Sequence, residues 1–386
     1  MAVCGSTEER HGIVLASTPE AKKCGVKTAM VNWEARRACP NLIMVPPDYH
    51  LYIDFSKRLR QLYADCTDKV EPFGLDECWV DISGKGIGIN EGMETAAKLR
   101  RRAKEELGLT LSVGVSYNKI FAKLGSDMKK PDATTLISKD NYREVAWPCP
   151  VEDMLGVGRR MLPKMHSRDI QTIGDLAKQP PEMMHKWLGK MGVILQQFAA
   201  GEDRTPVMRD GAESAIKSVG NSITAPRDMA SIEDMTCVLY LIADSVGARL
   251  REIGMRGKCI ALTVRDQDLH CFEGQKTIGF YTTNADDIVR VALDIFNTKG
   301  FEMLLPFRSV GISVSSLEPD VRPVQTDLFG QAARRNNIDQ LSRAIDGIRA
   351  RFGERAIERG IALANPIFNT IIPKADHLVH PVGFLR

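Results

Sequence analysis

Residues 112–131 read Ser112-Val113-Gly114-Val115-Ser116-Tyr117-Asn118-Lys119-Ile120-Phe121-Ala122-Lys123-Leu124-Gly125-Ser126-Asp127-Met128-Lys129-Lys130-Pro131. The stretch begins as a half-buried strand and continues as a helix with Lys119 and Lys123 one turn apart. Lys129 and Lys130 follow at the end of that helix. These lysines could neutralise a triphosphate, but cations near a helix C-terminus also stabilise the helix dipole. Taken alone, the stretch favours this second, structural interpretation.

A second stretch, residues 71–81, places two adjacent carboxylates, Asp76 and Glu77, at the start of an apolar strand. Neighbours in a regular strand point to opposite faces, so the two side chains reach one site only at a strand end or a kink, which Gly74 permits. Carboxylates in that position suit Mg²⁺, which prefers oxygen ligands and substrate phosphates. Taken alone, this pattern favours a solvated hairpin tip.

The composition sets only broad limits. The chain has 386 residues, 44% of them apolar, which allows two to four domains. We expect no membrane span, because no run of 18 apolar residues occurs. The nine cysteines form no C-x-x-C pair, so we expect neither structural zinc nor a disulfide scaffold, and a cytoplasmic location fits best. The net charge of +3 is too small to indicate nucleic-acid binding by itself.

Taken together, the two stretches resemble a known family. Residues 74–81 resemble the Ser-x-Asp-Glu-Ala-Tyr-x-Asp signature of the Y-family translesion DNA polymerases of the bacterial polymerase IV type. Residues 114–131 resemble that family's Gly-x-Ser-x-Asn-Lys-x-x-Ala-Lys-x-x-Ser-Asp-x-x-Lys-Pro signature, which is long and specific. The resemblance extends from about Val3 to about Leu317. It implies template-directed DNA synthesis past lesions by two-metal nucleotidyl transfer.

The implied fold is that of an α+β multidomain, right-hand polymerase. The resemblance implies fingers over residues 1–46, a palm over 47–148, a helical thumb with a helix-hairpin-helix over 149–210 and an α/β little finger over 215–317. Residues 318–386 would form a linker, a clamp-binding peptide and a tail. Apolar spacing and cap residues separately predict helices over 19–24, 32–38, 48–66, 94–107 and 337–352, and a strand over 109–116.

The resemblance also implies roles for single residues. Asp76 is expected to bridge two Mg²⁺ ions and Glu77 to bind the catalytic one. Lys130 is expected to contact the triphosphate of the incoming dNTP, as is Lys22, which stands where the family has an arginine. Contacts to the primer-template DNA are expected from Ser116, Lys119, Gly156, Gly158, Arg159 and Lys217.

The sequence also departs from the family pattern. Gly74 replaces a serine, and Pro19 replaces a tyrosine that contacts phosphate. The family opens with a strand that carries an Asp-x-Asp motif and an aromatic sugar gate, and nothing in this chain matches it. We therefore expect incomplete fingers, a palm without its first strand, two of three metal carboxylates and little or no DNA synthesis by the chain as it stands.

Three glycine-rich or apolar motifs predict binding partners. The hairpin at Gly156-Val157-Gly158 could bind a DNA phosphate through backbone N–H groups, although such a motif is more often a plain turn. Residues 188–192 could form a second such hairpin. Gln325, Leu328 and Phe329 resemble the sliding-clamp-binding peptide of bacterial polymerases; a loop folded back on its own domain is the alternative.

Two other functions remain open. A non-catalytic relative could bind DNA and the clamp without synthesis, although it would have no need for Asp76, Glu77 and Lys130. A helix-hairpin-helix nuclease could use two carboxylates for hydrolysis, but that function does not account for the lysine-rich residues 118–131. We expect primer-template DNA, a dNTP and a sliding clamp as partners, and a monomeric protein.

Overall fold

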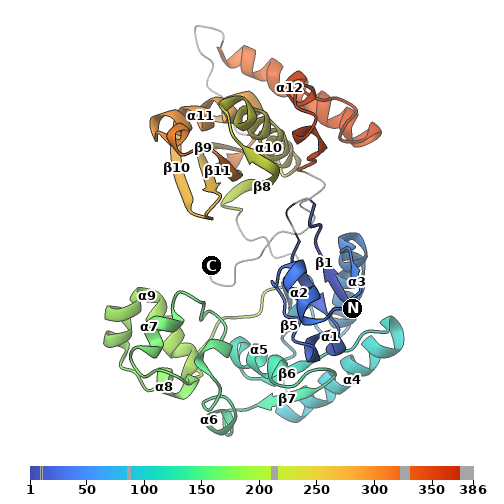
Figure 1. Cartoon of the computed structure of the whole chain (residues 1–386). Helices are drawn as coiled ribbons and strands as arrows, with labels where there is room; N and C mark the ends of the chain where they lie inside the picture. Colours follow the sequence, from blue (N-terminus) through green and yellow to red (C-terminus); the bar gives the residue numbers. More distant parts are fainter. Residues whose placement is uncertain (9, 11, 85–87, 210–215, 322–330, 374–386) are drawn as a thin grey trace. The chain divides into compact units, whose positions relative to one another are not determined.

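The computed structural model describes residues 1–386 except 9, 11, 85–87, 210–215, 322–330 and 374–386, and it describes residues 331–336 by their backbone alone. The chain forms two compact units (Figure 1). The discontinuous unit comprises Met1–Asp48 and Ser214–Leu378, and the central unit comprises Tyr49–Glu213 with Val379–Arg386. Among the described residues, no helix is both long enough and apolar enough to span a membrane.

The N-terminal part of the discontinuous unit is a small three-stranded sheet with two helices. The strand order is β2-β1-β3, where β1 (Ala2–Cys4) pairs antiparallel with β2 (Val14–Ser17) and parallel with β3 (Met44–Val45). The helices are α1 (Pro19–Lys23) and α2 (Asn32–Ala38). The predicted start of α1 is confirmed, because the Thr18 side chain accepts a hydrogen bond from the Ala21 N–H and Pro19 occupies the first turn.

The central unit begins with two long helices and two strand pairs. Helices α3 (Tyr49–Ala64) and α4 (Ile89–Leu107) pack together, and Gly108 ends α4 with φ +68°, as predicted. Strands β4 (Val70–Phe73) and β5 (Glu77–Val80) form an antiparallel hairpin. Strands β6 (Val113–Ser116) and β7 (Thr134–Ile137) are parallel, with α5 (Lys119–Met128) between them in sequence.

Strand β6 is shorter than the strand predicted over residues 109–116. It begins at Val113 because its partner β7 begins at Thr134, so the residues before Val113 have no facing strand to pair with. The alternation of apolar residues therefore located the strand correctly. The length of its hydrogen-bonded part is set by β7, which lies about twenty residues further along the sequence.

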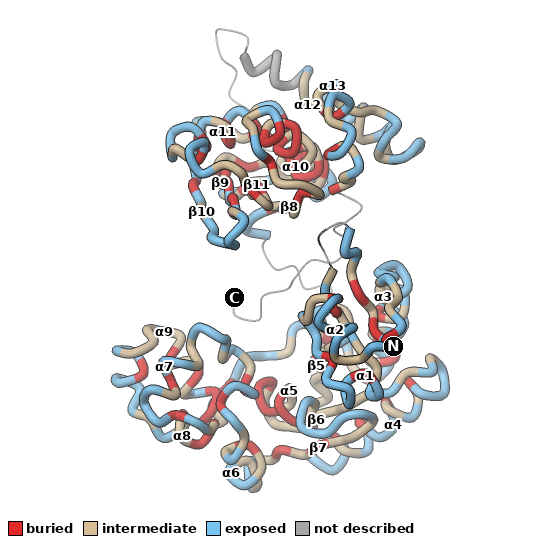
Figure 2. Tube along the Cα trace, in the orientation of Figure 1, coloured by how far each residue is buried: buried red, intermediate tan, exposed pale blue. Residues whose placement is uncertain are grey.

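The second half of the central unit is helical. It contains α6 (Tyr142–Val145), η1 (Val151–Asp153), α7 (Leu162–His166), α8 (Ile173–Ala177) and α9 (Pro181–Ala199). Thr172 and Asp175 form a capping box that starts α8. Buried residues of these helices and of α5 make one apolar core, and Figure 2 shows where the buried residues lie along the chain. Gly189 breaks α9 with φ +68° and ψ −157°, so the predicted second turn at residues 188–192 is present as a kink.

The C-terminal part of the discontinuous unit is a four-stranded antiparallel sheet with the order β10-β9-β11-β8. Its strands are β8 (Ser218–Met229), β9 (Met255–Asp266), β10 (Cys271–Thr282) and β11 (Phe307–Pro319). Helices α10 (Ile232–Glu252) and α11 (Ala285–Thr298) and the short η2 (Phe301–Leu304) pack against it. Their buried residues form the largest apolar core among the residues that the structure describes (Figure 2).

A C-terminal segment continues this core. It consists of α12 (Gln331–Phe352), α13 (Gly360–Leu363) and η3 (Phe368–Thr370), and it contacts α10. Phe368 is fully buried in the core of the sheet domain. Arg251 of α10 forms a bidentate ion pair with Asp346 of α12, at 2.6 and 2.9 Å. Residues 337–373 are therefore an integral part of this domain.

Candidate active site

The β4–β5 hairpin presents the two predicted metal carboxylates. Phe73 pairs with Glu77 at the end of the ladder, and the turn between them holds Gly74 and Asp76. Gly74 has φ +78°, a backbone conformation that glycine adopts without strain. Asp76 is exposed and forms no hydrogen bond or ion pair with the described residues, while Glu77 begins β5. The predicted kink at the strand end is thus present.

Helix α5 contacts this hairpin and packs very closely against β6. An added Cβ at Gly114 of β6 would stand 1.8 Å from the Ala122 carbonyl oxygen of α5. The helix starts at Asn118, whose side chain accepts a hydrogen bond from the Phe121 N–H at 2.8 Å. This short strand-to-helix connection places Lys119 and Lys123 on the side of α5 that meets the hairpin.

A chain of ion pairs connects the hairpin to the end of α5. The Lys123 ammonium lies 3.0 Å from a Glu77 oxygen and 2.6 Å from an Asp127 oxygen. The other oxygen of Asp127 lies 2.8 Å from the ammonium of Lys130. Glu77 and Lys130, predicted to act at one site, are therefore joined through Lys123 and Asp127, and sequence reasoning assigned no role to Asp127.

The charged groups in this row of ion pairs shift one another's pKa values. Burial alone would lower the pKa of Lys123, but its bonds to Asp127 and Glu77 outweigh burial and raise the pKa. Burial would likewise raise the pKa of Asp127, but its bonds to Lys123 and Lys130 outweigh burial and lower the pKa. Both groups are therefore charged at neutral pH, and the positive charge beside Glu77 is retained.

Lys119 occupies a different environment from the one expected of a DNA contact. Its side chain is 4% exposed, and its ammonium lies 2.8 Å from both carboxylate oxygens of Glu71. Ser116 is also occupied within the fold, because its hydroxyl donates to the Ile137 carbonyl at 2.7 Å. These bonds account for both residues without a contact to DNA, and their predicted DNA contacts stay untested.

The remaining predicted contacts lie at exposed positions. Gly156, Gly158 and Arg159 are exposed in the turn before α7, where Gly156 has φ +97°. Lys22 is exposed on α1 and Lys217 is exposed just before β8, both in the discontinuous unit. The predicted clamp-binding residues Gln325, Leu328 and Phe329 lie outside the described residues.

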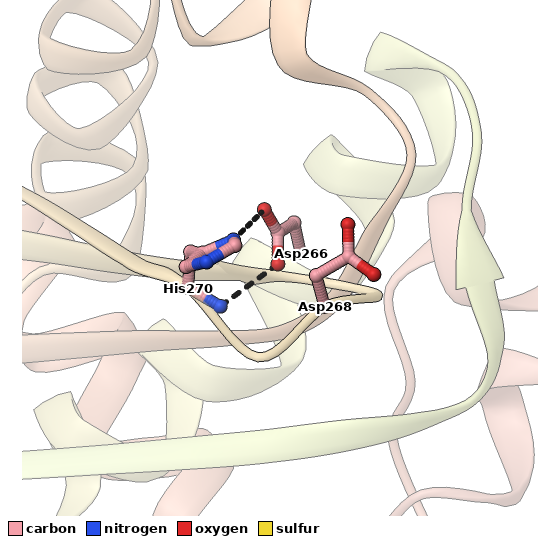
Figure 3. Close-up of side chains that lie close together, drawn as sticks. All are labelled: Asp266, Asp268 and His270. Carbon is pink, nitrogen blue, oxygen red and sulfur yellow. Dashed lines mark hydrogen bonds and ion pairs between the residues drawn. The ribbon is translucent and has the colours of Figure 1, made fainter.

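The turn between β9 and β10 holds a group of potential ligands that the sequence did not indicate (Figure 3). One ligand atom from each of Asp266, Asp268 and His270 lies within 4.8 Å of the others. The His270 N–H donates to one Asp266 oxygen at 2.8 Å, and the His270 Nδ1 lies 3.2 Å from the other oxygen. Such bonds are typical of a tight Asx-type turn and explain why these side chains meet.

The chain matches the models of one family over most of its length. The impB/mucB/samB family model matches residues 1–127, and the model of the C-terminal domain of that family matches residues 216–328. The chain is 43% identical over 371 residues to the DNA polymerase IV of Acetivibrio thermocellus, which covers 96% of this chain and 93% of that protein. The DNA polymerase IV of Pelotomaculum thermopropionicum is 38% identical over 361 residues, with 94% and 88% covered.

Solved structures share the fold. A Y-family DNA polymerase chimera of Dbh and Dpo4 superposes with a TM-score of 0.72 at 23% identity, covering 82% of this chain and 91% of that one. A Dbh ternary complex gives a TM-score of 0.55 at 22% identity, covering 81% and 90%. The chain therefore belongs to the DNA polymerase IV family, a family of Y-family, DNA-directed DNA polymerases. The predicted family, multidomain polymerase fold and enzyme class are confirmed.

Proposed function

We propose that the central unit carries out template-directed nucleotidyl transfer past DNA lesions, with Asp76 and Glu77 as the metal ligands. The observation that supports this most is the state of Asp76, an exposed carboxylate at the tip of a hairpin that Lys123 ties to α5. Asp76 forms no hydrogen bond or ion pair with any described residue. A carboxylate that serves only solubility has no need of such a fixed support. The family of the chain supplies the reaction class.

The two side chains fit Mg²⁺, for which we propose two ions. Mg²⁺ in polymerase sites is bound through one or two carboxylates, with water and substrate phosphates as the other ligands. Within the described parts of the chain, no third His, Cys, Asp or Glu completes a ligand group with Asp76 and Glu77. The bound ions would supply positive charge that favours deprotonation of the primer hydroxyl and stabilises the leaving pyrophosphate.

The lysines orient and neutralise this site. Lys123 holds one oxygen of Glu77, which leaves the other oxygen for a ligand. Lys130 is 58% exposed, so its ammonium can exchange Asp127 for the triphosphate of a dNTP. Lys22, exposed on α1, is proposed as a second triphosphate contact. The exchange at Lys130 replaces a carboxylate by a more highly charged anion, which favours the bound state.

We propose that the helical half of the central unit binds the DNA backbone. The exposed turn at Gly156 and Gly158 presents backbone N–H groups, and Arg159 adds a charge beside it. Lys217 is proposed as a further contact at the start of β8. Contacts of this kind are independent of base sequence and weaken with rising salt.

The location and the partners outside the active site follow from the family and the sequence. We propose that the sliding clamp binds at Gln325, Leu328 and Phe329, and that the protein acts as a monomer in the cytoplasm. The nine cysteines are all free thiols, which suits a reducing compartment. A DNA- and clamp-binding adaptor without synthesis is the alternative.

The test is binding of a fluorescent dNTP to the protein–DNA complex, titrated with Mg²⁺, together with primer extension. We expect Mg²⁺-dependent dNTP binding that Asp76→Ala abolishes. Glu105→Ala, which removes an exposed carboxylate on α4, should leave it unchanged. Equal dNTP binding by Asp76→Ala and the unaltered chain would contradict the proposed site. DNA binding with no Mg²⁺-dependent dNTP binding would favour the adaptor, and Mg²⁺-dependent nicking would favour a nuclease.

A further inference from the structure

The base of the metal hairpin contains a buried ion pair between Glu71 of β4 and Lys119 of α5. The Lys119 ammonium donates to both Glu71 oxygens at 2.8 Å, and the Lys119 and Glu71 side chains are 4% and 19% exposed. Removing two charges from water is costly, and the cost is offset only where geometry and further hydrogen bonds are favourable. This pair is therefore expected to have a specific task.

Trp79 joins the hairpin to the same lysine in two ways. Its indole N–H donates to the Lys119 carbonyl oxygen at 3.0 Å, and the Lys119 ammonium lies 4.6 Å from the centre of the ring. Trp79 is paired with Glu71 across the hairpin. Both strands are thus attached to the first residue of α5, so the angle between hairpin and helix is fixed at one point.

The segment that leaves the helical half of the central unit is bound at the same place. The backbone N–H of Met208 donates to a Glu71 oxygen at 2.8 Å, and the Lys119 ammonium donates to the Pro206 carbonyl at 3.4 Å. Two charged side chains therefore hold three pieces of chain: the hairpin, α5 and residues 206–208. Lys119 is buried within this contact, while Pro206 and Met208 lie at exposed positions.

We propose that Glu71 and Lys119 are positioning residues, which set the hairpin and thereby the metal carboxylates at its tip. This inference rests on the proposed function of Asp76 and Glu77. Glu71 lies on the strand whose last residue, Phe73, pairs with Glu77, so a tilt at the base moves the tip. Lys119 acts through the hairpin, and DNA is not its ligand. Because residues 206–208 bind to Glu71 and Lys119, the position of this pair also depends on the path of the chain after α9.

The experiment compares Glu71→Gln, Lys119→Met, Lys119→Arg and the double variant Glu71→Gln/Lys119→Met. A matched control is Lys69→Met. It removes the ion pair between the Lys69 ammonium and an Asp81 oxygen, which lie 2.9 Å apart at the open end of the same hairpin. The readouts are the Mg²⁺ concentration for half-maximal dNTP binding, the DNA affinity and the tryptophan emission of the folded protein. Far-ultraviolet circular dichroism identifies any variant that fails to fold, and the double variant leaves no unpaired buried charge.

We expect Glu71→Gln, Lys119→Met and the double variant to need roughly tenfold more Mg²⁺, because small displacements of reacting groups have large effects. DNA affinity should stay within about twofold, since Lys119 is buried. Lys119→Arg should restore most of the Mg²⁺ response, and Lys69→Met should match the unaltered chain.

Two results would overturn the inference. If the folded double variant responds to Mg²⁺ as Lys69→Met does, the pair does not position the hairpin. If Lys119→Met loses DNA affinity without a change in Mg²⁺ response, Lys119 is a DNA contact after all. Failure of the proposed function gives a different pattern, in which Asp76→Ala itself leaves Mg²⁺-dependent dNTP binding unchanged.

Discussion

The substitution Gly114→Ala should displace the helix that supports the metal hairpin. The added Cβ would meet the Ala122 carbonyl oxygen at 1.8 Å, the Ser126 nitrogen at 2.7 Å and the Ala122 carbonyl carbon at 2.8 Å. All three atoms belong to the backbone of α5, so no side-chain rotation relieves the overlap. Contacts of Cβ atoms essentially never fall below 3.0 Å, and α5 would have to retreat from β6 by about 1.2 Å.

The magnitude follows from this forced movement. Overpacking a tight interior costs about 1–3 kcal/mol and occasionally more, and a clash with a helix backbone lies at the upper end of that range. In a unit of this size each kcal/mol lowers the melting temperature by about 2–4 °C, so we expect a decrease of roughly 6–12 °C. A displacement near 1 Å of Lys123 and its Glu77 partner should also weaken dNTP binding by about tenfold or more.

Tryptophan fluorescence gives a specific assay. The chain has four tryptophans, of which Trp33 lies in the discontinuous unit and Trp79, Trp147 and Trp187 lie in the central unit. In a Trp33→Phe background, thermal unfolding followed by tryptophan emission therefore reports on the central unit alone. Mg²⁺-dependent dNTP binding is measured on the same variants below their melting range.

The control for this substitution is Gly92→Ala in α4. Its added Cβ would also face β6, but the nearest atom is a methyl carbon of Val115 at 3.0 Å, which a small side-chain shift relieves. In a helix interior, alanine is also more stabilising than glycine by about 1 kcal/mol of folding free energy. We expect Gly92→Ala to change stability by less than about 1 kcal/mol. Equal melting temperatures for Gly114→Ala and Gly92→Ala would refute the close packing of α5 on β6.

Three further predictions concern the discontinuous unit. Phe368→Ala should destabilise it by about 3–5 kcal/mol in urea denaturation, because the side chain is fully buried; a change below about 1 kcal/mol would show that the C-terminal segment is not part of the core. Hydrogen bonds from Arg227 lower the pKa of Asp234, so its stabilising effect is complete above its unfolded pKa, about 3.9, and is lost as pH falls through the folded value. Asp234→Asn should therefore show a smaller loss of stability on acidification, and an unchanged pH profile would contradict this. Leu328→Ala with Phe329→Ala should abolish binding to the clamp in a pull-down and spare DNA binding; unchanged clamp binding would exclude this peptide.

Local sequence signals predicted local structure well. The start of α1 at Thr18 and Pro19, the end of α4 at Gly108 and the kink at Gly74 each depend on one or two neighbouring residues. Such features follow from backbone preferences that a single residue carries. The family signatures then supplied the order of the elements, which periodicity alone does not give.

Interactions between distant residues could not be predicted in the same way. The family resemblance led us to expect Lys119 to contact DNA. A charged residue is rarely buried unless it is paired, and the partner of Lys119, Glu71, lies 48 residues earlier in the sequence. Burial of Phe368 depends on where the chain returns after α12. In both cases the missing information is the identity of the partner, which depends on tertiary packing.

The two lysines of α5 show how a sequence can nevertheless encode such a contact. Lys119 and Lys123 are four residues apart, which separates them by about 6 Å along a helix. Their partners are Glu71 and Glu77, and Glu77 pairs with Phe73, two residues along the strand from Glu71.

Two residue steps in a strand span about 6.8 Å, and directly paired residues project from the same face of a hairpin. The helix repeat and the strand repeat thus agree, and α5 can lie along one face of the hairpin with both ion pairs formed at once. Had the lysines been two or five residues apart, or had one glutamate been shifted by one position, one pair would point away. The spacing of these four residues therefore couples the buried support at the base of the hairpin to the carboxylate at its tip.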